Sequence, residues 1–418
     1  MINHKIYKGK NKFNPKNKIL ILVIRKQPGE VDWILPILHN VRKKINIIVI
    51  FEKNIALKLL KENYELYYYF LKSINYYLSS SKLKCLGLRL LKKTFGYFNL
   101  RKFEKKIQNK IYEKYYSLDN LKKIISCEEK NIEFKNVKIL CQDFTDNSPW
   151  IKKFYEKNDN TKIINYPHTT NIFNINKYKL KPSNVKFKRI FTLLSSKRDL
   201  SYFSKKFQNT NIYISGYPKY DLSWLTKISK NCNIKKYYSD KNIFIAFKGF
   251  ENFKYSKSKY VEQVKSLFEI AQKNSYKLIF KFHPNAQEEP VFLNIANRYP
   301  KDMWSITKKH IHICSKISKV FISFYSNAAV LDSLASEKVP VELWNISKKK
   351  KLFSNYSKLN LCIQVKNKID LEDKIEKIIN NKYEYIKKKE IIKNFIKIIN
   401  TKSSLSKLSD FFIKISQN

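Results

Sequence analysis

Two of the six histidines stand at the ends of segments that have the pattern of β-strands. His283 follows the alternating run KLIFKF (277–282), and His168 follows TKIINY (161–166) after one proline. Pro284 lacks an N–H and ends the strand, which would fix the imidazole of His283 at the rim of a sheet. The imidazole of His283 could donate to a phosphate oxygen or protonate a leaving group, which suits a side chain that titrates near neutral pH. His168 could serve as the base on the acceptor side of a transferase. A plain hydrogen-bonding role at a strand end is the simpler alternative.

A serine-rich segment, SFYSNAAVLDSLASEKVP, joins a strand pattern to a helical pattern between residues 323 and 340. Ser326 or Asn327 would cap the helix, and the free N–H groups of a first helical turn bind anions such as a diphosphate. Helix capping without any ligand explains the same residues.

Glycine is scarce, with six in the chain, and three of them follow strand patterns. Gly29 and Gly249 each follow the first strand of a candidate domain, where a side chain would block the approach of a ligand to the backbone. Gly216 opens the segment GYPKYD. Simple turns would also account for all three. The residues expected at a cleft or hinge are Gly29, Gly216, Pro218 and Asp221.

Strand and helix patterns alternate along the chain, and these elements would position the polar residues. A first series of strand patterns comprises 19–25, 45–51, 137–144, 161–166, 189–194 and 211–217. A second series comprises 242–247, 277–282, 319–324 and 339–344. Short apolar runs separated by helices are typical of doubly wound parallel sheets. We predict an α/β protein with two Rossmann-like domains whose parallel sheets face a central cleft.

The predicted domains are an acceptor domain (1–221), a polar linker (222–241), a nucleotide-donor domain (242–370) and C-terminal helices that pack back across the domains (371–418). Residues 64–106 interleave aromatic and basic side chains and predict a helical insertion in the first domain. This insertion is either an ordinary amphipathic element or a contact with an anionic membrane. The basic residues for such a contact are Lys82, Lys84, Arg89, Lys92 and Lys93.

The formal net charge is +50, from 84 Lys and Arg against 34 Asp and Glu. Lysine is spread along the whole chain, as an AT-rich coding bias would produce, so we predict a generally basic surface and no specific nucleic-acid face. Such a surface favours anionic partners such as nucleotides and phosphorylated substrates. A non-enzymatic protein that binds nucleic acid or another polyanion stays open as an alternative, and it predicts binding that weakens steeply with salt.

Several absences narrow the choice of function. The six cysteines form no C-x-x-C pair, which favours reduced thiols, and neither a signal peptide nor a membrane-spanning run is apparent. We therefore expect a cytoplasmic protein, resting at the inner face of the membrane if 64–106 binds lipid. The sequence contains no P-loop, G-x-G-x-x-G or D-x-D motif, so no cofactor and no metal is expected. One alternative is a metal site at His310, His312 and Cys314, but the same stretch also has the pattern of a helix.

The ordered set of YPHTTN, GYPKYD, KFHPN and the serine-rich segment resembles GT-B transferases of bacterial surface polymers. These include the CDP-glycerol glycerophosphotransferases and related capsule and lipopolysaccharide sugar transferases. The resemblance implies that His168 is the catalytic base and that His283 contacts the donor phosphate. This chain has Thr169 and Lys219 where the glycerophosphotransferases usually have glycine and arginine. The expected donor-binding residues are Lys248, Gly249, His283, Pro284, Ser323, Ser326, Asn327 and Asp332.

The function implied is the metal-independent transfer of a sugar or polyol phosphate in surface polysaccharide biosynthesis. The donor would be nucleotide-activated and the acceptor a glycan or a lipid-linked molecule. A nucleotide-sugar epimerase or hydrolase of the same fold is the second possibility.

Overall fold

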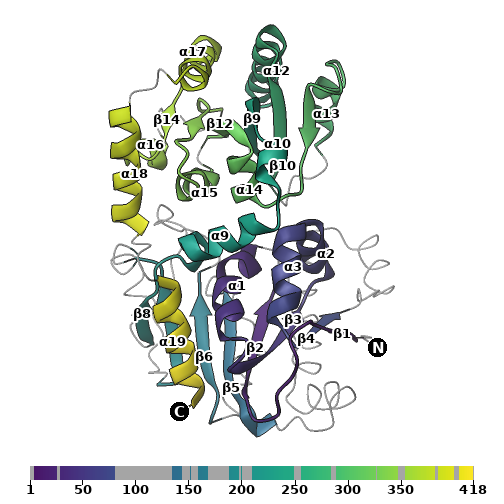
Figure 1. Cartoon of the computed structure of the whole chain (residues 1–418), viewed down its shortest axis with the longest axis vertical. Helices are drawn as coiled ribbons and strands as arrows, with labels where there is room; N and C mark the ends of the chain where they lie inside the picture. Colours follow the sequence, from purple (N-terminus) through teal and green to yellow (C-terminus); the bar gives the residue numbers. More distant parts are fainter. Residues whose placement is uncertain are drawn as a thin grey trace, which may run out of the picture. The chain divides into compact units, whose positions relative to one another are not determined.

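The computed structural model describes residues 4–25, 29–80, 134–143, 151, 159–167, 188–196, 199, 210–248, 256–283, 289–325, 327–346, 354–381, 385–399 and 404–417. The chain divides into two compact units, which Figure 1 colours by sequence position. Unit 1 comprises Met1–Lys61, Tyr67–Lys219 and Ser403–Asn418, and unit 2 comprises Glu62–Leu66 and Tyr220–Lys402. Each unit contains a β-sheet covered by helices, so the predicted α/β class with two Rossmann-like parts is confirmed.

Unit 1 is built on an eight-stranded sheet with the order β1-β4-β3-β2-β5-β6-β7-β8 among the described residues. β1 pairs with β4 antiparallel, and the other neighbouring strands are parallel. The central strands are short, buried apolar runs, as expected for a parallel sheet covered on both faces. The strands are β1 (His4–Lys8), β2 (Lys18–Ile24), β3 (Ile45–Phe51), β4 (Tyr76–Ser80), β5 (Val137–Asp143), β6 (Lys162–Tyr166), β7 (Ile190–Leu194) and β8 (Asn211–Ile214).

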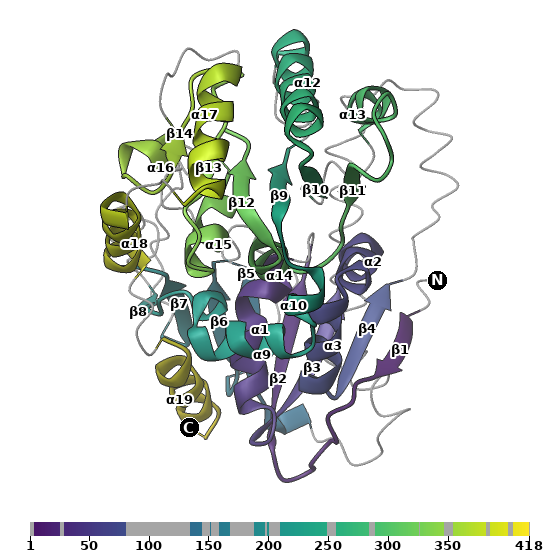
Figure 2. The same cartoon turned by 45° about the horizontal axis from the view of Figure 1, so that its top comes forward.

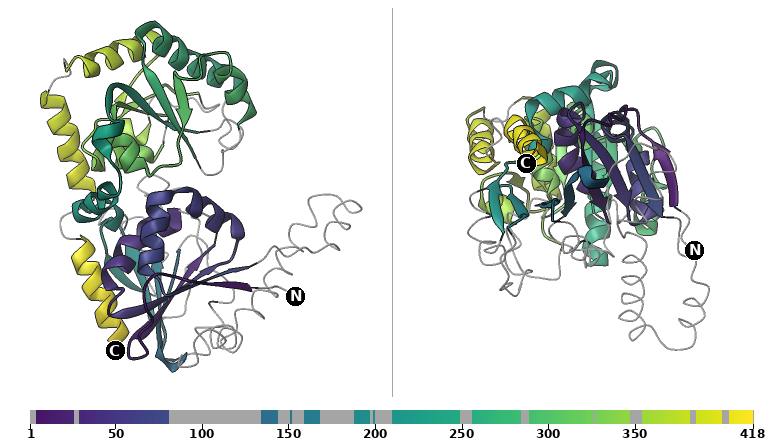
Figure 3. Two further views of the ribbon diagram at one scale, coloured as in Figure 1. Left: turned by 45° about the vertical axis from the view of Figure 1, so that its right-hand side comes forward. Right: turned by 90° about the horizontal axis from the view of Figure 1, so that it is seen from below.

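The helices of unit 1 include one from the far end of the chain. α1 (Gly29–Val41), α2 (Asn54–Glu62) and α3 (Tyr64–Ser73) lie between strands in sequence, and the C-terminal α19 (Ser404–Gln417) contacts α1 and β5. Phe411 of α19 stacks on Tyr213 with ring centroids 4.4 Å apart and meets Phe191 edge-on at 5.7 Å. The last helix (yellow in Figure 1 and Figure 3) therefore completes the core of unit 1.

Unit 2 contains a parallel sheet with the order β11-β10-β9-β12-β13-β14. Its strands are β9 (Ser239–Phe247), β10 (Lys277–Phe282), β11 (Trp304–Ile306), β12 (Ser318–Ser323), β13 (Val341–Glu342) and β14 (Ile363–Gln364). Its helices are α9 (Leu222–Lys230), α10 (Ile234–Tyr237), α12 (Lys257–Asn274), α13 (Pro290–Ala296), α14 (Ile311–Lys316), α15 (Ala329–Ala335), α16 (Asn355–Lys358), α17 (Lys368–Ile379) and α18 (Tyr385–Ile399).

One face of the unit 2 sheet holds a core rich in phenylalanine, packed against α12, α13 and α17 (Figure 2). Phe247 lies at its centre, with its ring centroid 4.6 Å from that of Phe282 and 4.7 Å from that of Phe324. Such tilted and edge-on pairs add to the free energy gained by burying the rings. α14 and α15 contact β12. This packing leaves the residues after β9 and β10 at the carboxyl edge of the sheet.

The structure differs from the expected helical insertion over 64–106. Residues 64–73 form α3, and residues 76–80 form β4, a member of the unit 1 sheet. Tyr76 and Tyr77 are buried. Aromatic side chains are common in strands, because they pack well against neighbouring strands and against helices that cover the sheet. Residues 81–106 lie outside the described part of the chain, and the membrane contact through them stays a prediction.

The polar segment 222–241, expected as a linker, is largely helical, since it forms α9, α10 and the first residues of β9. α17 and α18 belong to unit 2, whereas α19 belongs to unit 1. None of the helices in the described ranges is long and apolar enough to cross a membrane.

Candidate functional site

Lys248 and His283 occupy neighbouring positions at the carboxyl edge of the unit 2 sheet. Phe247 and Phe282 are partners in the parallel register of β9 and β10, and the two polar residues directly follow them. The backbone N–H of His283 donates to the carbonyl of Phe247 at 3.0 Å, which extends the ladder by one residue. Ligands of open α/β sheets bind at this edge, so the pair is the best-defined part of the predicted donor site.

The imidazole of His283 is partly buried and close to a positive charge. Burial, and to a smaller extent Lys248, lower the pKa of His283 to about 4. The ring is therefore neutral at pH 7, with one N–H donor and one acceptor nitrogen. The expectation that His283 titrates near neutral pH is therefore wrong for this environment. A bound phosphate would attract the charged form and raise the pKa again.

The serine-rich segment is held mainly by contacts within the protein. Ser323 is fully buried, and its hydroxyl has no hydrogen-bond partner among the described residues. The side-chain amide of Asn327 donates to the carbonyl of Ala246 at 3.2 Å and accepts from the N–H of Ala329 at 3.2 Å. These bonds tie the loop to β9 and begin α15, so Asn327 has a structural role whether or not a ligand binds. Asp332 lies in the first turn of α15.

A buried carboxylate that the sequence analysis did not single out, Glu342, ends β13. It is 0% exposed and lies between Ser323 of β12 and Gln364 of β14 in the register of the sheet. The thiol of Cys362 lies 3.7 Å from a carboxylate oxygen of Glu342, and burial followed by this charge raises the pKa of Cys362. A charged residue within the apolar run VPVELW was the signal in the sequence.

Unit 1 also concentrates acidic groups at the carboxyl edge of its sheet. Arg25 follows β2; its Nε lies 2.9 Å from the carboxylate of Glu52, and its backbone N–H donates to Glu30 at 2.9 Å. Asp143 at the end of β5 is the register partner of Tyr166 on β6. Burial, then Glu30 and Asp143, raise the pKa of Tyr166 well above its usual value. The positions of Glu52 and Asp143 at strand ends could have revealed part of the group from sequence.

The residues expected at the cleft or hinge have clear local roles. Gly216 has a φ of 68°, a left-handed conformation that favours glycine. Pro218 begins a 3₁₀ turn, and Asp221 caps α9 by accepting from the N–H of Ser223 at 2.9 Å. A Cβ added at Gly29 would meet no atom within 4 Å, so packing does not require glycine at the start of α1.

Four of the predicted site residues lie outside the described part of the chain: His168, Gly249, Pro284 and Ser326. The expectation that His168 and His283 meet at one cleft therefore stays a prediction.

The H-x-H-x-C segment forms the start of α14, and both of its histidines make hydrogen bonds within the protein. His310 caps α14, and its Nδ1 accepts from the N–H of His312 at 3.2 Å. The ring nitrogens of His312 lie 2.7 Å from the hydroxyl of Ser336 and 3.0 Å from that of Ser229. Within the described ranges, no group of three His, Cys, Asp or Glu residues is placed to hold a metal ion.

Comparison with solved structures identifies the fold. The putative UDP-N-acetylglucosamine 2-epimerase from Listeria monocytogenes matches with a TM-score of 0.58 and 10% identity, over 94% of this chain and 95% of that chain. The UDP-GlcNAc 2-epimerase from Methanocaldococcus jannaschii matches with a TM-score of 0.53 and 13% identity, over 94% and 99%. The calicheamicin glycosyltransferase CalG4 matches with a TM-score of 0.52 and 8% identity, over 96% and 98%.

No sequence-family model and no curated protein sequence matches the chain. The structural matches extend over nearly the whole length of both partners, so the protein has the GT-B fold.

Proposed function

We propose that the protein is a metal-independent GT-B transferase that uses a nucleotide-activated donor. It would move a sugar or polyol phosphate to a glycan or lipid-linked acceptor in surface polysaccharide biosynthesis. The observation that carries this proposal is the adjacency of Lys248 and His283 at the carboxyl edge of a parallel sheet. A cation beside a neutral imidazole N–H suits the oxygens of a diphosphate.

The donor diphosphate would bind beyond β9 and β10. The ammonium group of Lys248 would offset the negative charge that grows on the leaving diphosphate, and His283 would donate one N–H hydrogen bond. Charge stabilisation by preorganised groups is strongest where water is excluded. Asn327 would hold the adjacent loop in place, since its amide already bridges β9 and α15.

The acceptor would bind on unit 1, with His168 as the base that removes the proton of the acceptor hydroxyl. His168 comes two residues after Tyr166, the last residue of β6, and Asp143 ends the neighbouring strand. A carboxylate close to an imidazole base orients it and favours its protonated form. Replacing His168 with alanine should therefore lower turnover by about a hundredfold.

The donor site is tested by nucleotide-dependent thermal stabilisation of the full chain. Wild type is expected to be stabilised by at least one of CMP, CDP, UDP and GDP or their sugar conjugates, by about 2.7 kcal/mol at a hundred times the dissociation constant. Lys248→Met and His283→Gln should each reduce this stabilisation. Lys277→Met is the matched control, because Lys277 is exposed at the opposite end of β10. Equal loss in the control, or no nucleotide effect in wild type, would refute the proposed donor site.

A nucleotide-sugar epimerase is the second candidate. Glu30, Glu52 and Asp143 form a buried acidic group on unit 1, and carboxylates can move protons at a sugar carbon. Two of the structural matches described above are also named as epimerases. Mass spectrometry of the products separates the candidates, because a transferase enlarges the acceptor whereas an epimerase leaves the mass of the nucleotide sugar unchanged. A hydrolase of the same fold would release free nucleotide without enlarging any acceptor.

A further inference from the structure

The amino ends of β9 and β12 in unit 2 carry a second concentration of charge, at the edge of the sheet opposite Lys248 and His283. Asp240 is the second residue of β9, and Lys319 is the second residue of β12. The other members come from three further elements. The lysine cluster comprises Lys316 at the end of α14, Lys319 of β12, Lys338 between α15 and β13, and Lys388 of α18.

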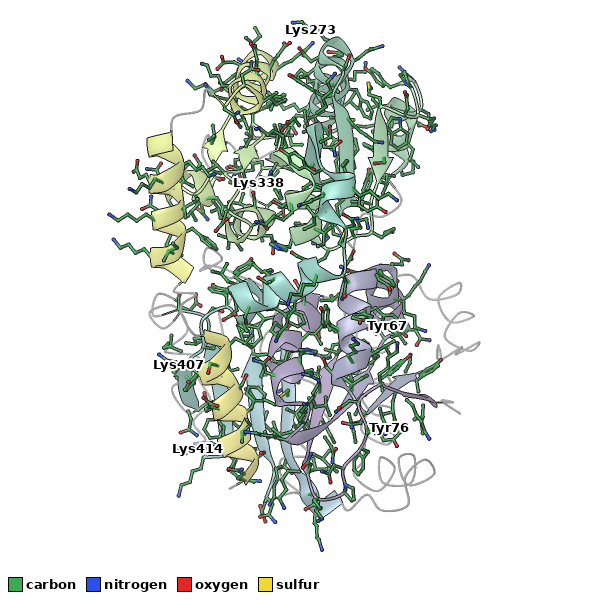
Figure 4. All side chains as sticks on the ribbon, in the orientation of Figure 1. Tyr67, Tyr76, Lys273, Lys338, Lys407 and Lys414 are labelled. Atoms are coloured by element: carbon green, nitrogen blue, oxygen red, sulfur yellow. The ribbon has the colours of Figure 1, made fainter. Side chains whose placement is uncertain are left out.

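Lys338, labelled in Figure 4, is positioned by the end of α15. Glu337 has a φ of 61°, and the N–H of Lys338 then donates to the carbonyl of Ser333 at 3.0 Å. The hydroxyl of Ser333 donates back to the carbonyl of Lys338 at 2.8 Å. The ammonium group of Lys338 donates to the carbonyl of Ser318, the first residue of β12. The charged end of the side chain is thus held in place by the fold.

Within the described ranges, Asp240 is the one carboxylate that forms an ion pair with the lysine cluster. Lys319 lies 3.6 Å from the carboxylate of Asp240 and donates to Asn381 at 2.8 Å. The hydroxyl of Tyr238 also donates to Asp240, at 2.6 Å. Asp240 is therefore already shared by two partners, and its charge also raises the pKa of Lys338.

The pKa of Lys338 reflects this concentration of positive charge. Burial, then the ammonium groups of Lys319, Lys316 and Lys388, lower the pKa of Lys338 to about 8, and Asp240 offsets only part of the effect. Several positive charges held together in a partly desolvated place repel one another, which costs free energy. A bound anion would reduce this repulsion and so stabilise the cluster.

We propose that the lysine cluster binds a phosphate-bearing anion at a site separate from the donor site. The oxygens of one phosphate can accept from several ammonium groups at once. The exposed Tyr238 flanks the site, because the ammonium of Lys338 lies 5.9 Å from its ring centroid. A soluble diphosphate and a lipid headgroup share this chemistry. The proposal is independent of the reaction that the enzyme catalyses.

Competitive acetylation of lysine amines, read by mass spectrometry on the full chain, tests the site directly. Pyrophosphate is expected to protect Lys338 and Lys316 at concentrations that leave Lys265 unprotected, because Lys265 is an exposed lysine on α12 of the same unit. The protection should persist in Lys248→Met, which alters only the proposed donor site. Equal protection of Lys265 would mean general screening of charge and would overturn the proposal.

Lys338→Met provides the matching binding test. It should weaken pyrophosphate binding, measured by calorimetry in the Lys248→Met background, by about tenfold, because one charge-assisted hydrogen bond to a phosphate oxygen is lost. Lys265→Met should leave the affinity unchanged. Loss of a partly buried ammonium among like charges should not unfold the protein, and circular dichroism checks this. An unchanged affinity in a folded Lys338→Met variant would overturn the proposal.

Vesicles distinguish the two sources of phosphate. Phosphatidylcholine vesicles with added phosphatidylglycerol should protect Lys338 and bind wild type more strongly than Lys338→Met if the ligand is a lipid headgroup. Protection by pyrophosphate without any effect of the vesicles identifies a soluble ligand. If neither pyrophosphate nor these vesicles protect Lys338, the proposal is wrong.

Discussion

At the scale of single residues, the environment decides what the histidines can do. His283 has the sequence context of a phosphate-contacting group, yet burial and Lys248 keep it neutral at pH 7. A neutral imidazole donates one hydrogen bond and keeps one acceptor, so it binds a phosphate oxygen without adding a full charge. Lys248 then supplies the positive charge at the candidate donor site.

The lowered pKa of His283 predicts a loss of stability in acid. Between pH 6.5 and about 4 the unfolded chain binds a proton at this residue that the folded protein does not, so the free energy of unfolding falls as the pH falls through this window. The loss at this site should be on the order of 3 kcal/mol. Urea unfolding of wild type and His283→Gln at several pH values measures it. Since His312 also has a pKa lowered to about 3, the variant should be less acid-sensitive than wild type but not insensitive. Parallel curves for the two proteins would contradict the prediction.

At the scale of elements, short turns after the strands position the candidate site. Gly216 comes two residues after the end of β8 and adopts a left-handed conformation, while Asp221 caps the start of α9 with its side chain. The GYPKYD segment, interpreted from sequence as part of a cleft, therefore has a structural role that stands without a ligand.

Gly216→Ala should destabilise unit 1 by about 1–2 kcal/mol, because an L-residue with a Cβ is strained at this backbone conformation. Gly29→Ala is the control: it adds a Cβ in open space at the start of α1 and should be neutral or slightly stabilising. Denaturant unfolding, followed by the fluorescence of the buried Trp33 of α1, reports on the unit that contains both residues. Equal effects of the two substitutions would argue against the strain at Gly216.

The strand patterns were the most informative part of the sequence at this scale. Continuous apolar runs correctly predicted β2, β3, β5 and β9, because strands buried on both faces are made mostly of apolar side chains. β4 was wrongly included in a helical insertion, since its tyrosines fit an amphipathic helix as well as a strand. β14 has two residues and β11 has three, too few to show a period.

At the scale of the whole molecule, the net charge of +50 is the dominant electrostatic feature. Net charge affects solubility and non-specific binding but does not determine the fold, which here is GT-B. The basic surface alone therefore does not define the function. The protein should bind DNA weakly, with an affinity that falls steeply between low and physiological salt. Fluorescence anisotropy with two unrelated duplexes measures this. Tight, sequence-selective binding at physiological salt would instead favour the polyanion-binding alternative.

The sequence by itself determined the alternation of strands and helices, the α/β class and the strand-end position of His283, because these depend on neighbours along the chain. Only the tertiary structure decided which polar groups share an edge of a sheet. The lowered pKa of His283, the acidic group around Arg25 and the lysine cluster around Lys338 all arise from residues that are distant in sequence. Charge interactions depend on separation in space and on burial, and neither quantity can be read from the order of residues alone.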